Sequence, residues 1–231
     1  ADVARRRPID PAATLFRPGS ISKLFTATAV MQLVQRGKLN LDADINIYLD
    51  FTIPSQNGKP ITLRNILTHT AGFEELGRGV IVMKPENIVD LDKFLKRHVP
   101  DRIFPPGETP AYSNYGFGVA GYIVQRVSGM PFADYVDRYI FGPLQMTRSS
   151  FHQPLQARFQ PFVSKGYEKA SGEVQPYEYV NPVSAGGLAA TGADMARFMI
   201  AHLNRGNGLL RPETADIMHN TKLTILSPLN R

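Results

Sequence analysis

The stretch Pro18-Gly19-Ser20-Ile21-Ser22-Lys23 stands directly before an apolar segment that runs from Leu24 to Val34. A helix that opens at Ser20 places residues three apart on one face, so we expect the Ser20 hydroxyl and the Lys23 amine side by side at its first turn. The helix N-terminus carries partial positive charge, which favours an anion near Ser20 and disfavours the ammonium form of Lys23. Because a lysine acts as a base only when its pKa is lowered, this placement predicts a serine nucleophile with a lysine partner.

The same spacing also has a purely structural interpretation. A Ser-x-x-Lys pair is expected about 0.4 times by chance in a chain of this usage. Ser20 could then be a helix N-cap, with Lys23 a solvated residue of the first turn. The segment from Leu24 to Val34 is apolar on nearly every side, however, which predicts a buried helix rather than an amphipathic one. A lysine that leads a buried helix favours the functional interpretation.

Composition limits the classes of protein to be considered. The chain has 231 residues with 43% hydrophobic content, enough to bury a core as one domain or two small ones. It has no cysteine, which excludes disulfides and thiol catalysis. The net charge is +6, of which Arg5-Arg6-Arg7 supplies half, and no basic stripe, zinc-finger spacing or dinucleotide glycine motif indicates a nucleic-acid partner. No apolar run approaches the roughly 20 residues of a membrane span.

Apolar periodicity and capping residues predict a mainly helical chain. We expect helices over 20–34, 62–67, 85–97, 115–128, 131–141, 193–204 and 212–219. Residues 38–50 read as an irregular segment whose alternating apolar side chains point inward, namely Leu39, Leu41, Ile45, Ile47 and Leu49. Residues 160–182 read as short strands or extended loop, and 184–187 as a tight turn.

A second candidate cluster is Tyr112-Ser113-Asn114, which follows a loop stiffened by Pro105-Pro106-Gly107 and Pro110. A helix is expected to start here, where Asn114 can cap it. A rigid loop followed by a helix holds a phenol and an amide in fixed geometry, which favours Tyr112 and Asn114 as site residues. Tyr179-Val180-Asn181 has the same spacing and is the rival, although its surroundings look pliable.

Several other segments accompany these two clusters in a fixed order. They are Phe16 to Phe25, Leu67-Thr68-His69-Thr70-Ala71-Gly72, Pro106-Gly107 with Tyr112 to Gly116, Gly142-Pro143-Leu144, and Ser184-Ala185-Gly186-Gly187-Leu188 with Asp194-Met195-Ala196-Arg197-Phe198. Together they resemble the serine hydrolases related to class C β-lactamases, D-alanyl-D-alanine carboxypeptidases and their esterase cousins. The resemblance covers essentially the whole chain.

The resemblance implies a role for each candidate residue. Ser20 would attack a carbonyl to form an acyl-enzyme, and its backbone N–H would supply half of an oxyanion hole. Lys23 and Tyr112 would shuttle the proton, and which of them is the base stays open, as in related β-lactamases. Asn114 would hydrogen-bond Lys23 and the substrate's amide. The substrate would be a β-lactam, a D-Ala-D-Ala peptide or a short ester, with no cofactor and no metal, in a periplasmic or exported protein.

One part of the family's pattern is missing from this sequence. The family carries a third motif, Lys-Thr-Gly or His-x-Gly, on a strand near its C-terminus, and no such segment follows Asp194. We therefore expect the helical domain of the β-lactamase/transpeptidase-like fold, mainly α with minor β, with most of the central antiparallel sheet absent from this chain. Residues 1–19 would be a remnant of the sheet region, 20–205 the mostly helical domain with both motifs, and 206–231 the start of the return to the sheet.

The missing motif leaves two alternatives to an active hydrolase. The chain could be a catalytically inactive fragment or binding module of the same fold. The strands could instead be lost by truncation or supplied by another chain, and the exposed sheet-facing surface of the Ser20 helix would then favour self-association.

The five histidines give no sign of a metal or of a Ser-His-Asp enzyme. His69, within Thr68-His69-Thr70, is expected to be a hydrogen-bonded structural residue rather than a catalytic base. The others, His98, His152, His202 and His219, lack metal-ligand spacing. The chain has no Gly-x-Ser-x-Gly elbow either.

Overall fold

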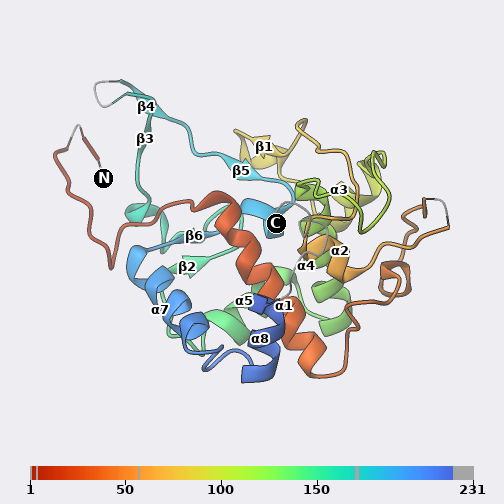
Figure 1. Cartoon of the computed structure of the whole chain (residues 1–231). Helices are drawn as coiled ribbons and strands as arrows, with labels where there is room; N and C mark the ends of the chain where they lie inside the picture. The colour runs from red at the N-terminus through yellow and green to blue at the C-terminus, as the bar shows by residue number, and fades with distance from the viewer. Residues whose placement is uncertain (1, 4, 57, 170–171, 221–231) are drawn as a thin grey trace, which may run out of the picture.

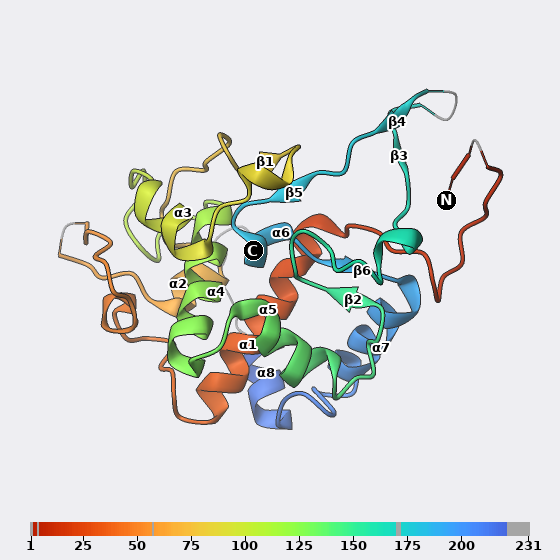
Figure 2. The same cartoon turned by 180° about the vertical axis from the view of Figure 1, so that it is seen from behind.

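The structure is a computed structural model that describes residues 2–3, 5–56, 58–169 and 172–220. Helix α1 (Ser22–Gln35) runs through the middle of the molecule in both views, with the other helices packed around it (Figures 1 and 2). The helices that follow are α2 (Leu63–Leu67), α3 (Leu91–Arg97), α4 (Asn114–Ser128), α5 (Phe132–Val136), α6 (Val183–Gly186), α7 (Gly192–Leu203) and α8 (Pro212–Asn220). Short 3-10 turns cover Gly19–Ile21, Ile45–Tyr48, Pro85–Asn87 and Gln160–Phe162, and a π-helical turn, Asp137–Phe141, continues α5.

β-Structure is minor within the described ranges. Three two-residue strand pairs form, all antiparallel: β1 (Ile81–Val82) with β5 (Tyr179–Val180), β2 (Ser149–Ser150) with β6 (Ala189–Ala190), and β3 (Gly166–Tyr167) with β4 (Val174–Gln175). The β3–β4 hairpin and the N-terminal segment project together from one side of the molecule (Figure 1). The expected mainly α architecture with minor β is thus confirmed, whereas the division at residues 19 and 205 stays a prediction.

The core forms where α1 meets α4, α6 and α7. Phe25 of α1 is fully buried; its ring stacks on Phe198 at 3.8 Å and meets Phe141 and Phe151 edge-on at 5.8 and 6.0 Å. Helix α6 approaches α4 closely, since a Cβ on Gly121 would lie 2.3 Å from the Ser184 Cβ. A glycine at this position lets the two backbones meet, which brings the α6 carbonyl groups up to α1.

Two loops far apart in the sequence are held together by backbone pairing, and we call this the Gly72 clasp. The amide of Ile103 donates to the Gly72 carbonyl at 2.9 Å, and the amide of Glu74 donates to the Asp101 carbonyl at 2.9 Å. Gly72 has φ +78, and a Cβ there would lie 1.9 Å from the Phe104 carbonyl oxygen. Only glycine permits this approach. The loop after α2 and the proline-stiffened loop before α4 are therefore one joined unit.

Most predicted helices occur within a residue or two of their expected bounds, and three expectations are wrong. The helix expected over 85–97 is a 3-10 turn, Pro85–Asn87, followed by α3, because Ile88 is extended at ψ 130 and the Val89 amide bonds the Asn181 side chain. Ile47 is expected to point inward but is 67% exposed, since the 3-10 turn Ile45–Tyr48 turns its side chain outward. The tight turn expected at 184–187 is the short helix α6.

None of the helices in the described ranges combines the length and the apolarity that a bilayer crossing needs.

Candidate active site

Ser20 lies in the 3-10 turn that leads into α1, and its side chain is exposed. The turn is fixed from below by Ser22, whose buried hydroxyl donates to the Gly19 carbonyl at 2.6 Å and accepts from the Leu188 amide at 3.2 Å. Helix α1 begins at Ser22 with Ile21 as its N-cap residue, so Ser20 is not the cap. The structural interpretation of the Ser20 and Lys23 pair as cap and solvated lysine is therefore wrong.

Lys23 is 5% exposed and its Nζ has three partners. The Nζ lies 3.1 Å from Ser20 Oγ, 2.6 Å from Asn114 Oδ1 and 2.8 Å from the Ala185 carbonyl oxygen. Three partners match the three N–H donors of an ammonium group. They equally match a neutral amine that donates to Asn114 and Ala185 and accepts a hydrogen bond from the Ser20 hydroxyl.

Tyr112 completes a triangle with Ser20 and Lys23. Its Oη lies 2.5 Å from Ser20 Oγ, and the Lys23 Nζ lies 4.7 Å from the centre of its ring. The ring also stacks on the His69 imidazole, with 4.5 Å between the ring centres. The phenol is 46% exposed, so it borders the solvent side of the triangle. The structure thus brings Ser20, Lys23 and Tyr112 together as the sequence predicts.

His69 supports the Tyr112 loop. Its Nδ1 accepts a hydrogen bond from the Ser113 amide at 3.2 Å, and its carbonyl accepts one from the Ala111 amide at 2.7 Å. Burial, together with the nearby Lys23 charge, lowers the pKa of His69 from 6.5 to about 4. The imidazole is therefore neutral at pH 7 and serves as an acceptor. The prediction of a hydrogen-bonded structural histidine is confirmed.

Asn114 is the first residue of α4, and its side chain connects Lys23 to a residue that sequence reasoning missed. Its Oδ1 accepts from Lys23, while its Nδ2 donates to Glu75 Oε1 at 2.6 Å. Glu75 Oε2 also accepts from the Asn114 backbone amide at 2.9 Å. The expectation that Asn114 caps the helix is wrong, because the N-cap is Ser113, whose hydroxyl accepts from the Gly116 amide. Nothing in the local sequence marks Glu75; the Gly72 clasp brings its loop to α4.

The rival pair, Tyr179 and Asn181, lies elsewhere. Tyr179 belongs to β5 and pairs with Val82, and its ring meets Tyr177 edge-on at 5.2 Å. Asn181 is buried, accepts from the Val89 amide and donates to the carbonyls of Gly79 and Asn87. These hydrogen bonds hold the neighbouring loops together, which is a structural role for Asn181. The geometry therefore favours Tyr112 and Asn114 as the site residues.

The environment of Lys23 acts on its pKa in two opposite ways. Burial lowers the pKa from 10.5 and is the largest influence, whereas the hydrogen bond and charge of Tyr112 and the charge of Glu75 raise it. Desolvation disfavours the ammonium form, which is the condition for a lysine base. The direction agrees with the sequence prediction, although its main cause is burial rather than the helix N-terminus.

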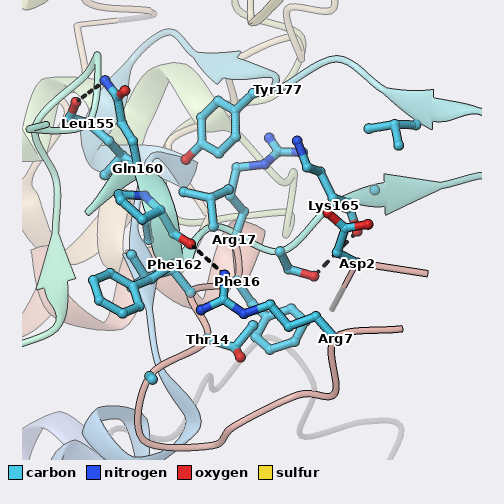
Figure 3. A pocket seen from close by; sticks show the side chains of 18 of the residues that line it. Asp2, Arg7, Thr14, Phe16, Arg17, Leu155, Gln160, Phe162, Lys165 and Tyr177 are labelled. Carbon is cyan, nitrogen blue, oxygen red and sulfur yellow. Dashed lines mark hydrogen bonds between the residues drawn. The ribbon is translucent and has the colours of Figure 1, made fainter. Parts of the chain in front are cut away.

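Two of the hollows in the described part of the chain are candidates for a binding site. A cavity of about 490 Å³ adjoins Ser20 and Tyr112 and is lined by apolar side chains of α1 and α8, including Leu24, Ala27, Met31 and Ile217. A larger one of about 900 Å³ lies between the N-terminal segment and residues 160–166 and 174–177, with Arg7, Phe16, Arg17 and Tyr177 around it (Figure 3). The larger hollow contains none of the four predicted site residues, so the candidate site is the smaller cavity.

Metal-ligand atoms gather at one place among the described residues. Asp134, Asp137 and His152 place one ligand atom each within 4.8 Å of one another. His152 Nε2 lies 2.9 Å from Asp137 Oδ2, and this bond raises the pKa of His152. The ion pair accounts for the grouping, which shares no residue with the Ser20 cluster.

Comparison with known proteins shows the family of the chain. The sequence model described as Beta-lactamase matches residues 1–225 of the chain. The chain belongs to the Beta-lactamase family. It is 32% identical over 190 residues to the putative penicillin-binding protein PbpX of Bacillus subtilis, covering 80% of this chain and 45% of that protein. It is 28% identical over 211 residues to a β-lactamase of Escherichia coli K12, covering 88% of this chain and 51% of that protein.

Solved structures of this family share the fold. The octameric penicillin-binding protein homologue from Pyrococcus abyssi matches with a TM-score of 0.76 at 27% identity, over 93% of this chain and 50% of that one. A class C β-lactamase from Rhodobacter sphaeroides matches with a TM-score of 0.73 at 26% identity, over 95% of this chain and 59% of that one. The chain thus spans about half the length of the relatives that it matches.

Proposed function

We propose that this Beta-lactamase family chain carries the nucleophile and proton-transfer groups of a serine hydrolase, which forms an acyl-enzyme on an amide or ester. The observation that carries the proposal is the triangle of Ser20 Oγ, Tyr112 Oη and Lys23 Nζ, with Oγ at 2.5 and 3.1 Å from the other two atoms. Both distances allow direct proton transfer from the serine hydroxyl. An exposed serine with two proton acceptors in reach is the arrangement that nucleophilic catalysis requires.

Lys23 is the base for acylation in this proposal. As a neutral amine, it donates to Asn114 Oδ1 and the Ala185 carbonyl, and its lone pair is left facing Ser20 Oγ. Burial supports this form by lowering the pKa of Lys23. Ser20 Oγ then forms a bond to the substrate carbonyl carbon as its proton passes to Lys23. The proton reaches the departing amine or alcohol through the Tyr112 hydroxyl, and water later hydrolyses the ester on Ser20.

The substrate class rests on the relatives and on the site's chemistry. Proteins named β-lactamase and penicillin-binding protein are among the relatives of this chain. A β-lactam, a D-Ala-D-Ala peptide and a short ester each present a carbonyl that the triangle can attack. We propose this group of small-molecule or peptide substrates. The periplasmic or exported location stays a prediction, which fractionation of the source cells tests.

Labelling by an acylating probe tests the nucleophile. The wild-type chain, treated with a fluorescent penicillin or a fluorophosphonate, is expected to become labelled, and Ser20→Ala is expected to lose the label. Ser55→Ala is the matched control, because Ser55 is exposed and lies outside the cluster. Equal labelling of the Ser20→Ala variant and the wild type would rule out Ser20 as the nucleophile.

A second candidate function is a catalytically inactive fragment or binding module. The observation that bears on it is that the chain spans about half the length of the relatives that it matches. Turnover of a nitrophenyl ester by this 231-residue chain, abolished in Ser20→Ala, excludes this alternative. Binding of a penicillin without acylation of Ser20 supports it.

A further inference from the structure

Glu75 lies outside the four predicted site residues but is joined to them by two short hydrogen bonds. Its carboxylate accepts from Asn114 Nδ2 at 2.6 Å and from the Asn114 backbone amide at 2.9 Å. The backbone amide is one of the unpaired N–H groups at the start of α4, a helix of 15 residues. A carboxylate at this place is stabilised by both N–H groups and by the helix dipole. Glu75 is therefore held in one position although its loop is exposed.

The Glu75 carboxylate fixes the orientation of the Asn114 amide. An ionised carboxylate only accepts hydrogen bonds, so the NH₂ end of the amide must face Glu75. The oxygen end of the amide then faces Lys23, at 2.6 Å from Nζ. With the amide reversed, its oxygen would face the carboxylate and its NH₂ would face the lysine donors. With Lys23 as the neutral amine, the hydrogen bonds thus run in one direction: Ser20 donates to Lys23, Lys23 donates to Asn114, and Asn114 donates to Glu75.

The charge of Glu75 also reaches Lys23. The titratable groups around the amine are Tyr112, stacked on His69, and Glu75 on the other side of Asn114. His69 is neutral at pH 7, since its pKa is lowered to about 4. Glu75 places a negative charge near the Lys23 amine. This charge favours the ammonium form of Lys23, which burial disfavours. Removal of that charge disfavours the ammonium form further.

We propose that Glu75 is a positioning residue for acylation: it orients the Asn114 amide so that the Lys23 lone pair faces Ser20, and its charge sets the pH at which that amine becomes neutral. The proposal rests on the proposed function, because Lys23 is the base in both. Glu75 acts through Asn114 and needs no contact with substrate. Its expected signature has two parts, a lower maximal acylation rate and a shifted pH dependence.

Glu75→Gln tests the expected change in rate and the expected change in pH dependence in a variant that keeps the shape of the side chain. Glutamine keeps the size of the side chain, but its NH₂ group replaces one of the two carboxylate oxygens that accept from Asn114, so one of these hydrogen bonds becomes a donor facing a donor. We expect the maximal acylation rate to fall by about 10-fold to 100-fold, as for a small misplacement of a reacting group. Because the lost charge lowers the pKa of Lys23, the rising limb of rate against pH moves to lower pH. Glu75→Ala is expected to show the same shift with a larger loss.

The control is Glu74→Gln, which makes the same charge change one residue away, where the side chain is exposed. It is expected to keep the wild-type acylation rate and the wild-type dependence of that rate on pH. Glu75→Asp keeps the charge but shortens the reach, so it is expected to restore the pH limb while the rate stays reduced. A pH limb in Glu75→Gln that coincides with the wild type, or an equal shift in Glu74→Gln, overturns the proposal.

NMR titration of Lys23, with ¹³C-labelled lysine and assignment by Lys23→Arg, distinguishes failure of this proposal from failure of the proposed function. The titration reports the pKa of Lys23 whether or not the chain acylates. A lower Lys23 pKa in Glu75→Gln than in the wild type supports the role of Glu75, even if Ser20 takes no label. An unchanged Lys23 pKa contradicts it, even if Ser20 is acylated normally.

Discussion

The two sides of α1 differ in how the described residues cover them. On the side toward α4 and α6, Ser22 and Thr26 are fully buried and Lys23 is 5% exposed, yet each of their polar atoms has a partner. On the opposite side, Ile21 and Leu24 are 49% and 48% exposed, and Leu24 borders an apolar cavity. The polar residues of this helix are inside and some of its apolar residues are outside.

The residues of α1 that serve the candidate site and the apolar residues that remain exposed therefore lie on different sides of the helix. Buried polar groups are retained only where partners satisfy them, so the side facing α4 is constrained by the hydrogen bonds around Lys23. The side with Leu24 carries no such constraint, and its half-exposed apolar groups add little to the core. Substitutions on the two sides are therefore expected to fail in different assays.

The largest expected effect follows from removing the amine on the polar side. Lys23→Ala is expected to lower the rate of Ser20 acylation by roughly 10² to 10⁴-fold, the usual contribution of a general base. The measurement is single-turnover labelling by a fluorophosphonate. Lys38→Ala is the control, since Lys38 is an exposed residue just beyond α1 and is expected to leave the rate unchanged. Comparable losses in both variants would contradict the assignment.

The next effect concerns the aromatic core around Phe25. Phe25→Ala removes a fully buried ring packed among Phe141, Phe151 and Phe198. We expect the free energy of unfolding to fall by about 3–5 kcal/mol. Urea denaturation followed by circular dichroism measures the change. A loss below about 1 kcal/mol would show that the ring cluster is not the core of the folded chain.

Acid is expected to destabilise the polar side through His69. The folded imidazole stays neutral down to about pH 4, whereas its ordinary pKa is 6.5. Between these values the unfolded chain binds more protons, so the free energy of unfolding falls as the pH drops from about 6.5 to about 4. His202, whose pKa is also lowered to about 4, adds a separate loss over the same range.

The His69 contribution is isolated by His69→Asn. Asparagine tolerates the left-handed backbone at this position, where φ is 56, and it does not titrate. The pH dependence of the free energy of unfolding is expected to be weaker in this variant than in the wild type. Parallel curves for the two proteins between pH 4 and 7 would contradict the neutral, buried state of His69.

The smallest expected effect lies on the exposed side of α1. Leu24→Ser is expected to change the free energy of unfolding by less than about 0.5 kcal/mol, since the side chain is already about half exposed. The same change is expected to reduce any self-association through this surface, measured by sedimentation velocity. A large loss of stability in the monomer would show that Leu24 is covered in solution.

The sequence predicts the part of the site that depends on local structure. Ser20 and Lys23 are three residues apart at a helix start, and Tyr112 and Asn114 follow a loop that prolines make rigid, so spacing and stiffness are enough to suggest them. Glu75 depends on a tertiary contact. It reaches Asn114 because backbone hydrogen bonds join its loop to residues 101–104. No periodicity or motif in the sequence predicts this pairing of loops.

The errors in the fold have the same origin. The apolar face expected over 85–97 predicts one helix, but the Val89 amide is drawn to the Asn181 side chain and the helix starts only at Leu91. Ile45 and Ile47 look alike in the sequence, yet Ile45 is fully buried and Ile47 is 67% exposed, because a 3-10 turn does not alternate its side chains as a strand does. Long-range partners act in both cases, since the 3-10 turn is itself tied to a distant segment by the hydrogen bond from the Ile45 amide to the Ile61 carbonyl.

The Gly72 clasp has a consequence for protein engineering. A side chain at Gly72 would collide with the Phe104 carbonyl, so the backbones of the two loops must stay in close contact. The loop that carries Glu75 and the loop that carries Tyr112 therefore cannot be redesigned one at a time. A graft that replaces one loop with that of a relative breaks the backbone bonds on both. The smallest transplantable unit of this site is therefore discontinuous, residues 69–75 together with 101–114, and loop exchange between relatives is expected to succeed only when both pieces come from the same parent.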